Sequence, residues 1–109
     1  MRQAEPLTIL NAQLVTRAGV VAGALRCCCG VIDAIGADVA PQDGDAVVDA
    51  RGRLLAPGLV DLGVFAVDKP AFHFGGITRA ALMPDQSPPL DLPSRVGFIA
   101  KSGKPDLWV

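Results

Sequence analysis

The chain has 109 residues, of which 50% are hydrophobic, and its mean hydropathy is +0.39. This length allows one domain of modest size, and so small a domain cannot bury that much apolar surface by itself. The formal net charge is −1, aromatic residues make up 5% of the chain and tyrosine is absent. Without a basic patch or a set of aromatic side chains for base stacking, the composition argues against nucleic-acid binding.

The apolar stretches of the sequence are too short to cross a membrane. A spanning helix needs about 20 apolar residues in a row. Charged residues interrupt every long apolar run, namely Arg26, Asp33, Asp38, Arg51, Arg53 and Asp61. Glu5, Pro6 and Asn11 also break up any apolar core of a signal peptide. We therefore expect a cytoplasmic chain that does not contact a membrane and that packs against something larger.

Three consecutive cysteines, Cys27, Cys28 and Cys29, stand out in the first half. Metal sites usually separate two cysteines by two to four residues, so that both thiolates can reach one ion. Neighbouring residues of a strand point to opposite faces, so Cys28 should oppose the other two. We interpret the three as small buried strand residues, with a redox or metal role as the alternative.

Short strands separated by turns are predicted for the first half of the chain. Runs of apolar and β-branched residues place strands at 7–10, 13–16, 20–29, 31–35, 46–49 and 54–56. Turn residues separate them at 11–12, 17–19, 30, 43–44 and 50–53. Asp43-Gly44 is a strong reverse-turn dipeptide, and Gly52 suits a backbone with positive φ.

The second half of the sequence has a different pattern. After Pro57-Gly58, residues 59–65 are apolar at nearly every position, which is typical of a strand buried on both faces in a parallel sheet. A second buried strand is predicted at 77–83. Residues 84–89 contain three prolines and must form a loop. A helix opens at Pro93-Ser94 and ends after Lys101, and residues 106–109, with Trp108 in the core, begin a further strand.

Together these elements predict a mixed α/β chain in two parts. Residues 1–58 should form an N-terminal β-sandwich, and residues 59–109 should supply the first strands of an incomplete TIM-like barrel. A whole (β/α)₈ barrel needs about 250 residues, so we expect the barrel to be truncated in this chain.

Two segments carry a resemblance to a known family. Between Gly30 and Leu62 the chain reads G-V-I-D-A-I-G and later V-V-D-A-R-G-R-L-L-A-P-G-L-V-D-L. This resembles the amino-terminal signature of the cyclic amidohydrolases, which include dihydroorotase, dihydropyrimidinase and allantoinase. Residues 75–91, G-G-I-T-R-A-A-L-M-P-D-Q-S-P-P-L-D, resemble the element that follows the first barrel helix of dihydroorotases. The two segments together favour dihydroorotase over the other amidohydrolases.

The resemblance implies a zinc-dependent hydrolase of pyrimidine biosynthesis whose metal-activated water opens or closes a cyclic amide. In this family two alternating histidines of the first barrel strand bind the metal, and an arginine two residues later binds the substrate carboxylate. Those positions correspond here to Gly63, Phe65 and Val67, whose side chains offer neither a metal ligand nor a cation. The substrate-binding asparagine of the family corresponds to Asp85. We therefore expect no catalytic residue, no metal ligand and no cofactor in this chain, and only Asp85 as a candidate substrate contact.

Two further residues near the missing histidines are possible ligands. His73 is the sole histidine, and it lies in residues 66–74, a segment too short for a normal barrel helix with both its loops. Zinc needs three or four donors, so a loop or packing role is favoured for His73 over ligand replacement. Asp61 is expected to bond backbone groups or a neighbouring strand rather than a metal, because a buried acid must be satisfied.

Three functional interpretations remain open from the sequence. The chain could be a dihydroorotase-family fragment that is inactive by itself. It could be a pseudoenzyme, since some dihydroorotase-like proteins without the metal histidines are structural partners of aspartate carbamoyltransferase; an active dihydroorotase subunit is another possible partner. An incomplete gene product is compatible with either interpretation.

Overall fold

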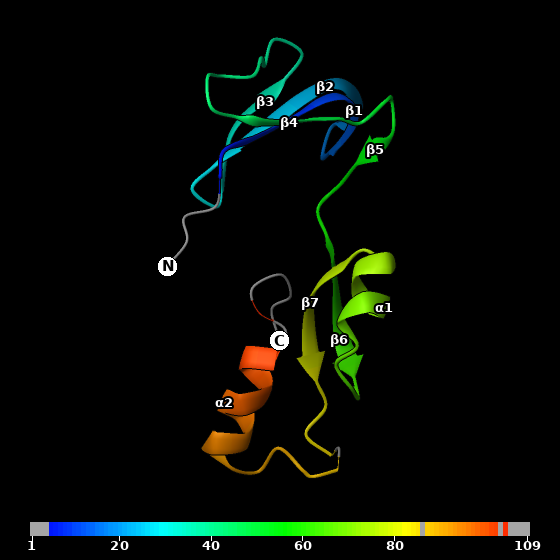
Figure 1. Cartoon of the computed structure of the whole chain (residues 1–109). Helices are drawn as coiled ribbons and strands as arrows, with labels where there is room; N and C mark the ends of the chain where they lie inside the picture. The colour runs from blue at the N-terminus through cyan, green and yellow to red at the C-terminus, as the bar shows by residue number, and fades with distance from the viewer. Residues whose placement is uncertain (1–4, 86, 103, 105–109) are drawn as a thin grey trace. The chain divides into compact units, whose positions relative to one another are not determined.

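The computed structural model describes residues 5–85, 87–102 and 104. The chain divides after Pro57 into two compact units. The first unit consists of strands, and the second combines two strands with two helices (Figure 1). The strand predicted at 106–109, and Trp108 with it, lie outside the described residues.

The first unit is a single five-stranded sheet built around β1 (Leu7–Thr16). β2 (Gly19–Cys28) pairs antiparallel with β1, and β3 (Val31–Gly36) pairs antiparallel with β2. On the other side of β1, β4 (Ala46–Asp49) and β5 (Leu54–Leu55) run parallel to its first and second halves. The turns at 17–18, 29–30, 43–44 and 51–52 lie where the sequence predicts turns.

The prediction of a β-rich N-terminal unit is confirmed, but a two-layered sandwich is not seen in the described residues. A sandwich buries the inner face of one sheet against a second sheet. Here the buried apolar core of the unit is small, formed by Ala12, Leu14 and Ala24. Large apolar side chains of the strands stay exposed, among them Val20, Val21, Val31, Ile32, Ile35, Val47 and Val48.

The turn predicted at residues 11–12 is wrong, because β1 continues through it. Asn11 takes a left-handed backbone with φ of 54°, and the register with β2 shifts between Ile9 and Ala12. Asparagine tolerates this conformation better than most residues. Its side-chain Nδ2 donates to Oδ1 of Asp49 at 3.0 Å. The irregularity is a bulge, and β4 and β5 pair with β1 on either side of it.

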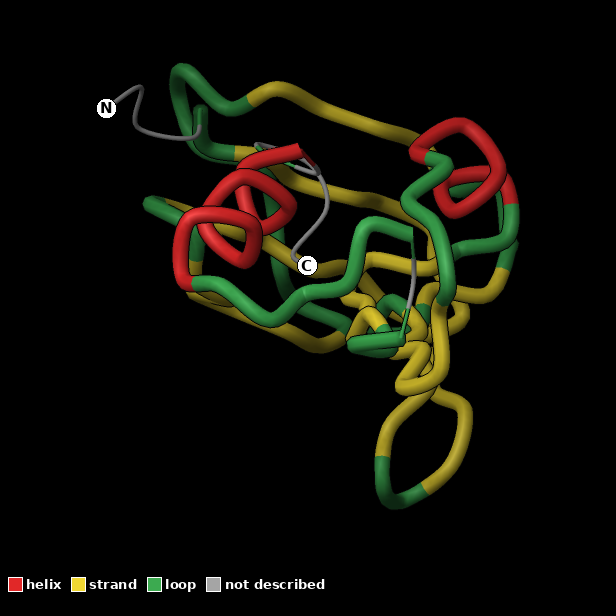
Figure 2. Tube along the Cα trace, turned by 90° about the horizontal axis from the view of Figure 1, so that it is seen from below, coloured by secondary structure: helices red, strands yellow, loops and turns green. Residues whose placement is uncertain are grey.

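The second unit contains β6 (Leu59–Val64), α1 (Lys69–Phe74), β7 (Ile77–Leu82) and α2 (Pro93–Ser102). β6 and β7 run parallel, with α1 as the connection between them. The strand at 77–82, the loop after it and the second helix agree with the sequence predictions. The helices are the short red coils in Figure 2. Among the described residues, no helix combines the length and apolarity that a membrane crossing requires.

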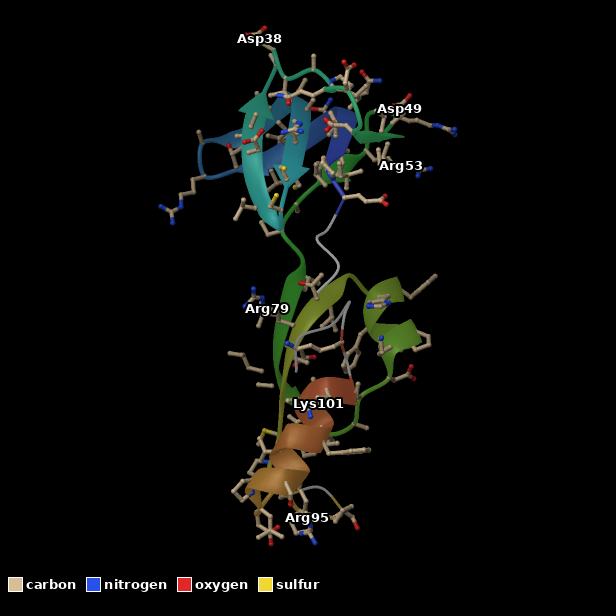
Figure 3. All side chains as sticks on the ribbon, turned by 60° about the vertical axis from the view of Figure 1, so that its left-hand side comes forward. Asp38, Asp49, Arg53, Arg79, Arg95 and Lys101 are labelled. Atoms are coloured by element: carbon tan, nitrogen blue, oxygen red, sulfur yellow. The ribbon has the colours of Figure 1, made fainter. Side chains whose placement is uncertain are left out.

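A local ion pair joins the segment before helix α2 to the first turn of the helix. Arg95, at one end of this helix in Figure 3, donates from Nη1 to Oδ1 of Asp91 at 2.6 Å. The spacing of four residues is the one at which side chains of a helical turn meet. Both side chains are well exposed, so the pair adds little to stability.

The prediction that β6 is buried on both faces is wrong. Leu59, Val60 and Leu62 are 56% to 75% exposed, and Val64 is the buried residue of the strand. A parallel strand is buried when neighbouring strands and covering helices surround it. In the described part of the unit β6 has one neighbouring strand, β7, so most of its apolar side chains remain exposed.

The segment predicted as a loop before Gly75 is instead the six-residue helix α1. Asp68 caps it, since its Oδ1 accepts from the backbone N–H of Ala71 at 3.2 Å. Pro70 lies in the first turn, where a helix needs no backbone donor. Asp followed closely by Pro is a helix-start signal, and a helix of six residues forms here although the segment is short.

Candidate functional site

The carboxyl ends of β6 and β7 lie at one edge of the parallel pair. The backbone N–H of Met83 donates to the carbonyl of Val64 at 2.8 Å, which joins the two strand ends. Gly63 lies near the end of β6, Phe65 directly follows it, and Asp85 is in the turn after β7. Active sites of α/β barrels form at this edge. The structure thus brings together at one edge the positions that the resemblance assigns to metal and substrate.

The side chains at this edge do not fit a zinc ion. Phe65 is 61% exposed and offers only its ring. Gly63 has no side chain, and its backbone N–H donates to Oδ1 of Asp61 at 3.0 Å, which confirms the backbone role predicted for Asp61. The side chain of Val67 is a hydrocarbon and offers no metal ligand. Within the described ranges, no group of three or more His, Cys, Asp or Glu side chains is arranged to hold a metal. Asp85 is exposed, and its substrate contact stays a prediction.

His73 lies at the other edge of the parallel pair. It is an exposed residue in the last turn of α1. Its carbonyl accepts from the N–H of Gly76 at 3.1 Å, and the carbonyl of Gly76 accepts from the N–H of Leu59 at 2.8 Å. Leu59 begins β6, whereas Gly63 and Phe65 end it. His73 is therefore on a helix rather than in a loop, and it is not placed to replace either lost ligand.

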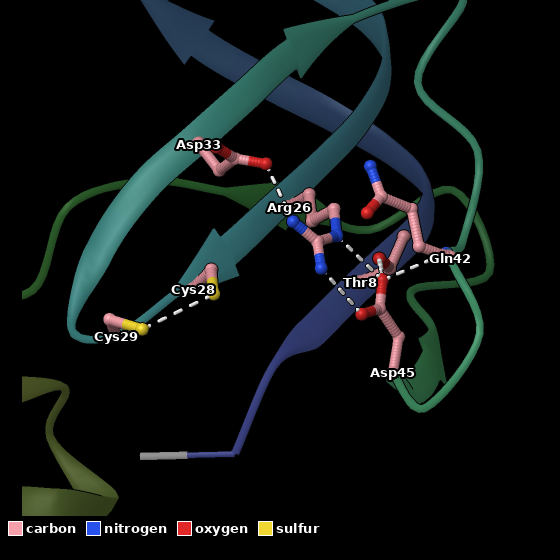
Figure 4. A network of polar contacts seen from close by, with 7 residues as sticks. All are labelled: Thr8, Arg26, Cys28, Cys29, Asp33, Gln42 and Asp45. Atoms are coloured by element: carbon pink, nitrogen blue, oxygen red, sulfur yellow. Dashed lines mark hydrogen bonds and ion pairs between the residues drawn. The ribbon is translucent and has the colours of Figure 1, made fainter. Parts of the chain in front are cut away.

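The most extensive polar network of the described chain lies in the first unit and centres on Arg26 and Asp45 (Figure 4). Nε and Nη2 of Arg26 donate to the two carboxylate oxygens of Asp45, both at 2.8 Å. Thr8 and the backbone of Gln42 also donate to Asp45, at 2.6 and 3.0 Å. Nη1 of Arg26 reaches Asp33 at 2.6 Å. A two-point pair with further donors satisfies charges that water cannot reach.

Burial makes this network important for folding. The Asp45 side chain is 0% exposed and that of Arg26 is 9% exposed. Hydrogen bonds from Arg26 and Thr8 hold the pKa of Asp45 well below its usual range, and the same pairing raises the pKa of Arg26. The network joins β1, β2, β3 and the loop before β4. The sequence did not predict this network, although the single arginine among the apolar residues of β2 was a signal of it.

Low pH should destabilise the first unit, because it protonates the carboxylates of Asp45 and Asp49. The pKa of Asp45 is lowered by Arg26, and that of Asp49 is lowered by its hydrogen bond from Asn11. A carboxylate whose pKa is lower in the folded state stabilises fully above the unfolded value of about 3.9 and loses this effect as the pH falls below it.

We therefore expect the urea midpoint to stay level from pH 7 to about pH 5 and to fall below about pH 4. Urea titrations followed by circular dichroism at several pH values measure it. The Asp45→Asn variant should show a weaker decline, and a wild-type midpoint that is constant down to about pH 2.5 would contradict this account.

The cysteines are arranged differently from the alternating pattern that a continuous strand predicts. Cys27 and Cys28 end β2 and are half-buried, while Cys29 lies in the following turn, exposed, with φ of 56°. All three are free thiols. The Sγ atoms of Cys28 and Cys29 are 3.4 Å apart, so the prediction that these two oppose each other is wrong. Cys27 instead lines an apolar cavity with Leu25 and Ile32.

The chain is similar in sequence to the dihydroorotases of several bacteria. No family model matches the chain. It is 33% identical over 93 residues to the dihydroorotase of Acetivibrio thermocellus, which covers 73% of this chain and 21% of that protein. It is 36% identical over 86 residues to the dihydroorotase of Lactobacillus helveticus, which covers 67% of this chain and 19% of that protein.

A solved structure of the same fold is L-hydantoinase (dihydropyrimidinase) from Arthrobacter aurescens. It matches with a TM-score of 0.73 and 24% sequence identity, over 92% of this chain and 25% of that one. This likeness shows the fold. The chain spans about a fifth of the length of the curated dihydroorotases that it matches. The two segments quoted from the sequence, the relatives and the fold together identify a dihydroorotase-like cyclic amidohydrolase sequence.

Proposed function

We propose that the chain contributes a dihydroorotase-like scaffold to pyrimidine biosynthesis in the cytoplasm, without hydrolase activity of its own. One observation carries the proposal. At the edge where β6 and β7 end, the family positions for two metal-binding histidines hold Gly63 and Phe65, and the arginine position holds Val67. Opening a cyclic amide in this family depends on a metal-activated water, and these side chains supply no lone pair to hold the metal.

The second unit is, in this proposal, the beginning of a barrel. Two features support it: β6 and β7 run parallel, and α1 connects them. Strand, helix, parallel strand is the repeating element of the (β/α)₈ fold. The exposed apolar side chains of β6 then mark the faces on which further strands and helices of such a barrel pack.

The purified chain should not turn over dihydroorotate, even with zinc added. We expect substrate loss indistinguishable from a blank without protein, and no zinc retained after dialysis, because donors are missing at the strand end. Spectrophotometric assay of dihydroorotate and metal analysis of the dialysed protein measure the two results. Turnover that a chelator or the His73→Ala substitution abolishes would disprove the proposal.

A pair of variants tests the positions themselves. Gly63→His with Phe65→His restores two donors with the alternate spacing that points side chains to one face of a strand. We expect this double variant to bind zinc more tightly than the Phe65→His single variant, and to remain inactive because two ligands do not complete the site. Equal zinc binding by the double and the single variant would show that the two positions do not face one site.

A second candidate function is that of a non-catalytic companion to aspartate carbamoyltransferase or to an active dihydroorotase subunit. The observation that favours it is the apolar surface of the first unit, where Ile32 and Ile35 are 62% and 53% exposed beside a cavity of about 320 Å³. Contiguous exposed apolar side chains are typical of interaction surfaces.

Co-purification of the chain with either enzyme tests the companion function. Ile35→Asp should weaken the interaction, because it places a charge on the contact surface. Asp38→Asn, at an exposed position beyond the end of β3, serves as the control that leaves binding unchanged. A monomer by light scattering that captures neither enzyme would count against this function.

A further inference from the structure

The end of β2 brings two neighbouring thiols together. Cys28 is the last residue of the strand, and Cys29 begins the turn to β3 with a left-handed backbone. On a regular strand their side chains would point to opposite faces. Because the chain turns at Cys29, the two Sγ atoms instead lie 3.4 Å apart. Figure 4 shows the two side chains pointing toward each other, joined by a dashed line. The left-handed backbone at Cys29 thus places the thiols of two consecutive residues in contact.

The third cysteine is separate from this pair. Cys27 lines the apolar cavity of the first unit together with Leu25, which is two residues earlier and therefore on the same face of β2. Cys28 shares the opposite face with Arg26. Cys29 is exposed, whereas Cys28 is half-buried. The pair therefore combines one accessible sulfur with one sheltered sulfur at contact distance.

We propose that Cys28 and Cys29 are a reversible thiol–disulfide pair that closes to a vicinal disulfide when the chain meets a low-molecular-weight disulfide such as oxidised glutathione. The exposed Cys29 thiolate attacks one sulfur of the oxidised glutathione, forming a mixed disulfide and releasing one glutathione thiolate. Cys28, after giving its proton to water, attacks the Cys29 sulfur and displaces the second glutathione thiolate. Two electrons pass from the protein thiols to the glutathione disulfide, and two reduced glutathione molecules result.

The division of roles follows from the surroundings of each sulfur. The hydrogen bond between Cys28 and Cys29, together with burial, raises the pKa of the Cys28 thiol, while the charge of Arg26 lowers that pKa. A protonated, half-buried thiol is a poor first nucleophile, so the accessible Cys29 attacks first and Cys28 resolves the intermediate. Closing the bond brings the sulfurs from 3.4 Å to about 2.0 Å. In a reducing cytoplasm the pair stays open until the glutathione pool becomes oxidised.

The full chain, equilibrated with glutathione buffers of graded ratio and trapped by acid, provides the test. Mass spectrometry should show a species lighter by two hydrogens, with the cross-link mapped to Cys28 and Cys29. Cys28→Ser should leave glutathione bound to Cys29, and Cys29→Ser should abolish closure. Cys27→Ser is the matched control and should close as the wild type does. Circular dichroism of each reduced variant verifies that its strands have formed.

The role of the fold is tested by repeating the titration in urea. If the turn pre-organises the pair, closure in the folded chain should be favoured by about tenfold or more over the unfolded chain. Closure that is equal in both states would overturn the proposal. So would a glutathione adduct that persists on Cys29 while Cys28 is intact, or loss of closure in Cys27→Ser.

Discussion

The Asp45→Asn variant should unfold at a temperature about 10 °C or more below the wild type, because it leaves a buried arginine without its counter-charge. The substituted amide would keep the size of the side chain but would turn an N–H₂ group toward a guanidinium that has only donors. Arg26 is 9% exposed and would retain one carboxylate partner, Asp33, whose side chain is 47% exposed. Thermal unfolding at pH 7, followed by circular dichroism, measures the change.

Two further variants separate charge burial from other causes. Asp33→Asn removes the exposed partner of the same arginine and should lower the midpoint by only a few degrees. Replacing both buried partners, Arg26→Met with Asp45→Leu, should recover much of the loss, because apolar pairs of similar size often substitute for buried ion pairs. An Asp33→Asn effect equal to that of Asp45→Asn would contradict the view that burial gives Asp45 its importance.

The Gly23→Ala variant should lose about 2–3 kcal/mol of unfolding free energy through a backbone clash. A Cβ atom on Gly23 would stand 2.7 Å from the carbonyl oxygen and 2.8 Å from the carbonyl carbon of Gly36, and 3.0 Å from a methyl of Leu14. The leucine can rotate away, but Gly36 can yield only if the end of β3 moves away from β2. Urea unfolding at pH 7 measures the loss.

Gly63→Ala is the matched control for this clash. It introduces the same methyl group into another strand, where a Cβ would meet nothing within 4 Å. We expect a change within about 0.5 kcal/mol, since the methyl enters open space. If Gly63→Ala were as destabilising as Gly23→Ala, loss of glycine in a strand, and not contact with Gly36, would be the cause.

Local elements were the part of the fold that could be predicted. The strand at 46–49 and the helix that opens at Pro93 appear where the sequence places them. Both predictions depend on propensities and turn residues within a few positions of the element, which is information the segment itself carries. The bulge at Asn11 could not be predicted in this way, because Asn11 also favours turns and is held here by Asp49, far along the chain.

Packing was predicted less well than the elements. The apolar pattern of β6 indicates a strand buried on both faces, yet Leu62 is 75% exposed. The burial of a strand depends on how many strands and helices surround it, and the residues of the strand do not determine that number. Similarly, Arg26 and Asp45 are separated by 19 residues, and only the pairing of β1 with β2 and β4 brings their charges into contact.

The sequence by itself established that Gly63 and Phe65 carry no metal-binding atom, since the donors of a side chain are a property of the residue and no fold can add them. Only the folded structure decided that His73 lies at the far edge of the parallel pair, through strand pairing, and that Cys28 and Cys29 meet, through the local turn at Cys29. Proximity is produced by the path of the backbone, through strand pairing and a left-handed turn residue, and the order of residues does not contain it.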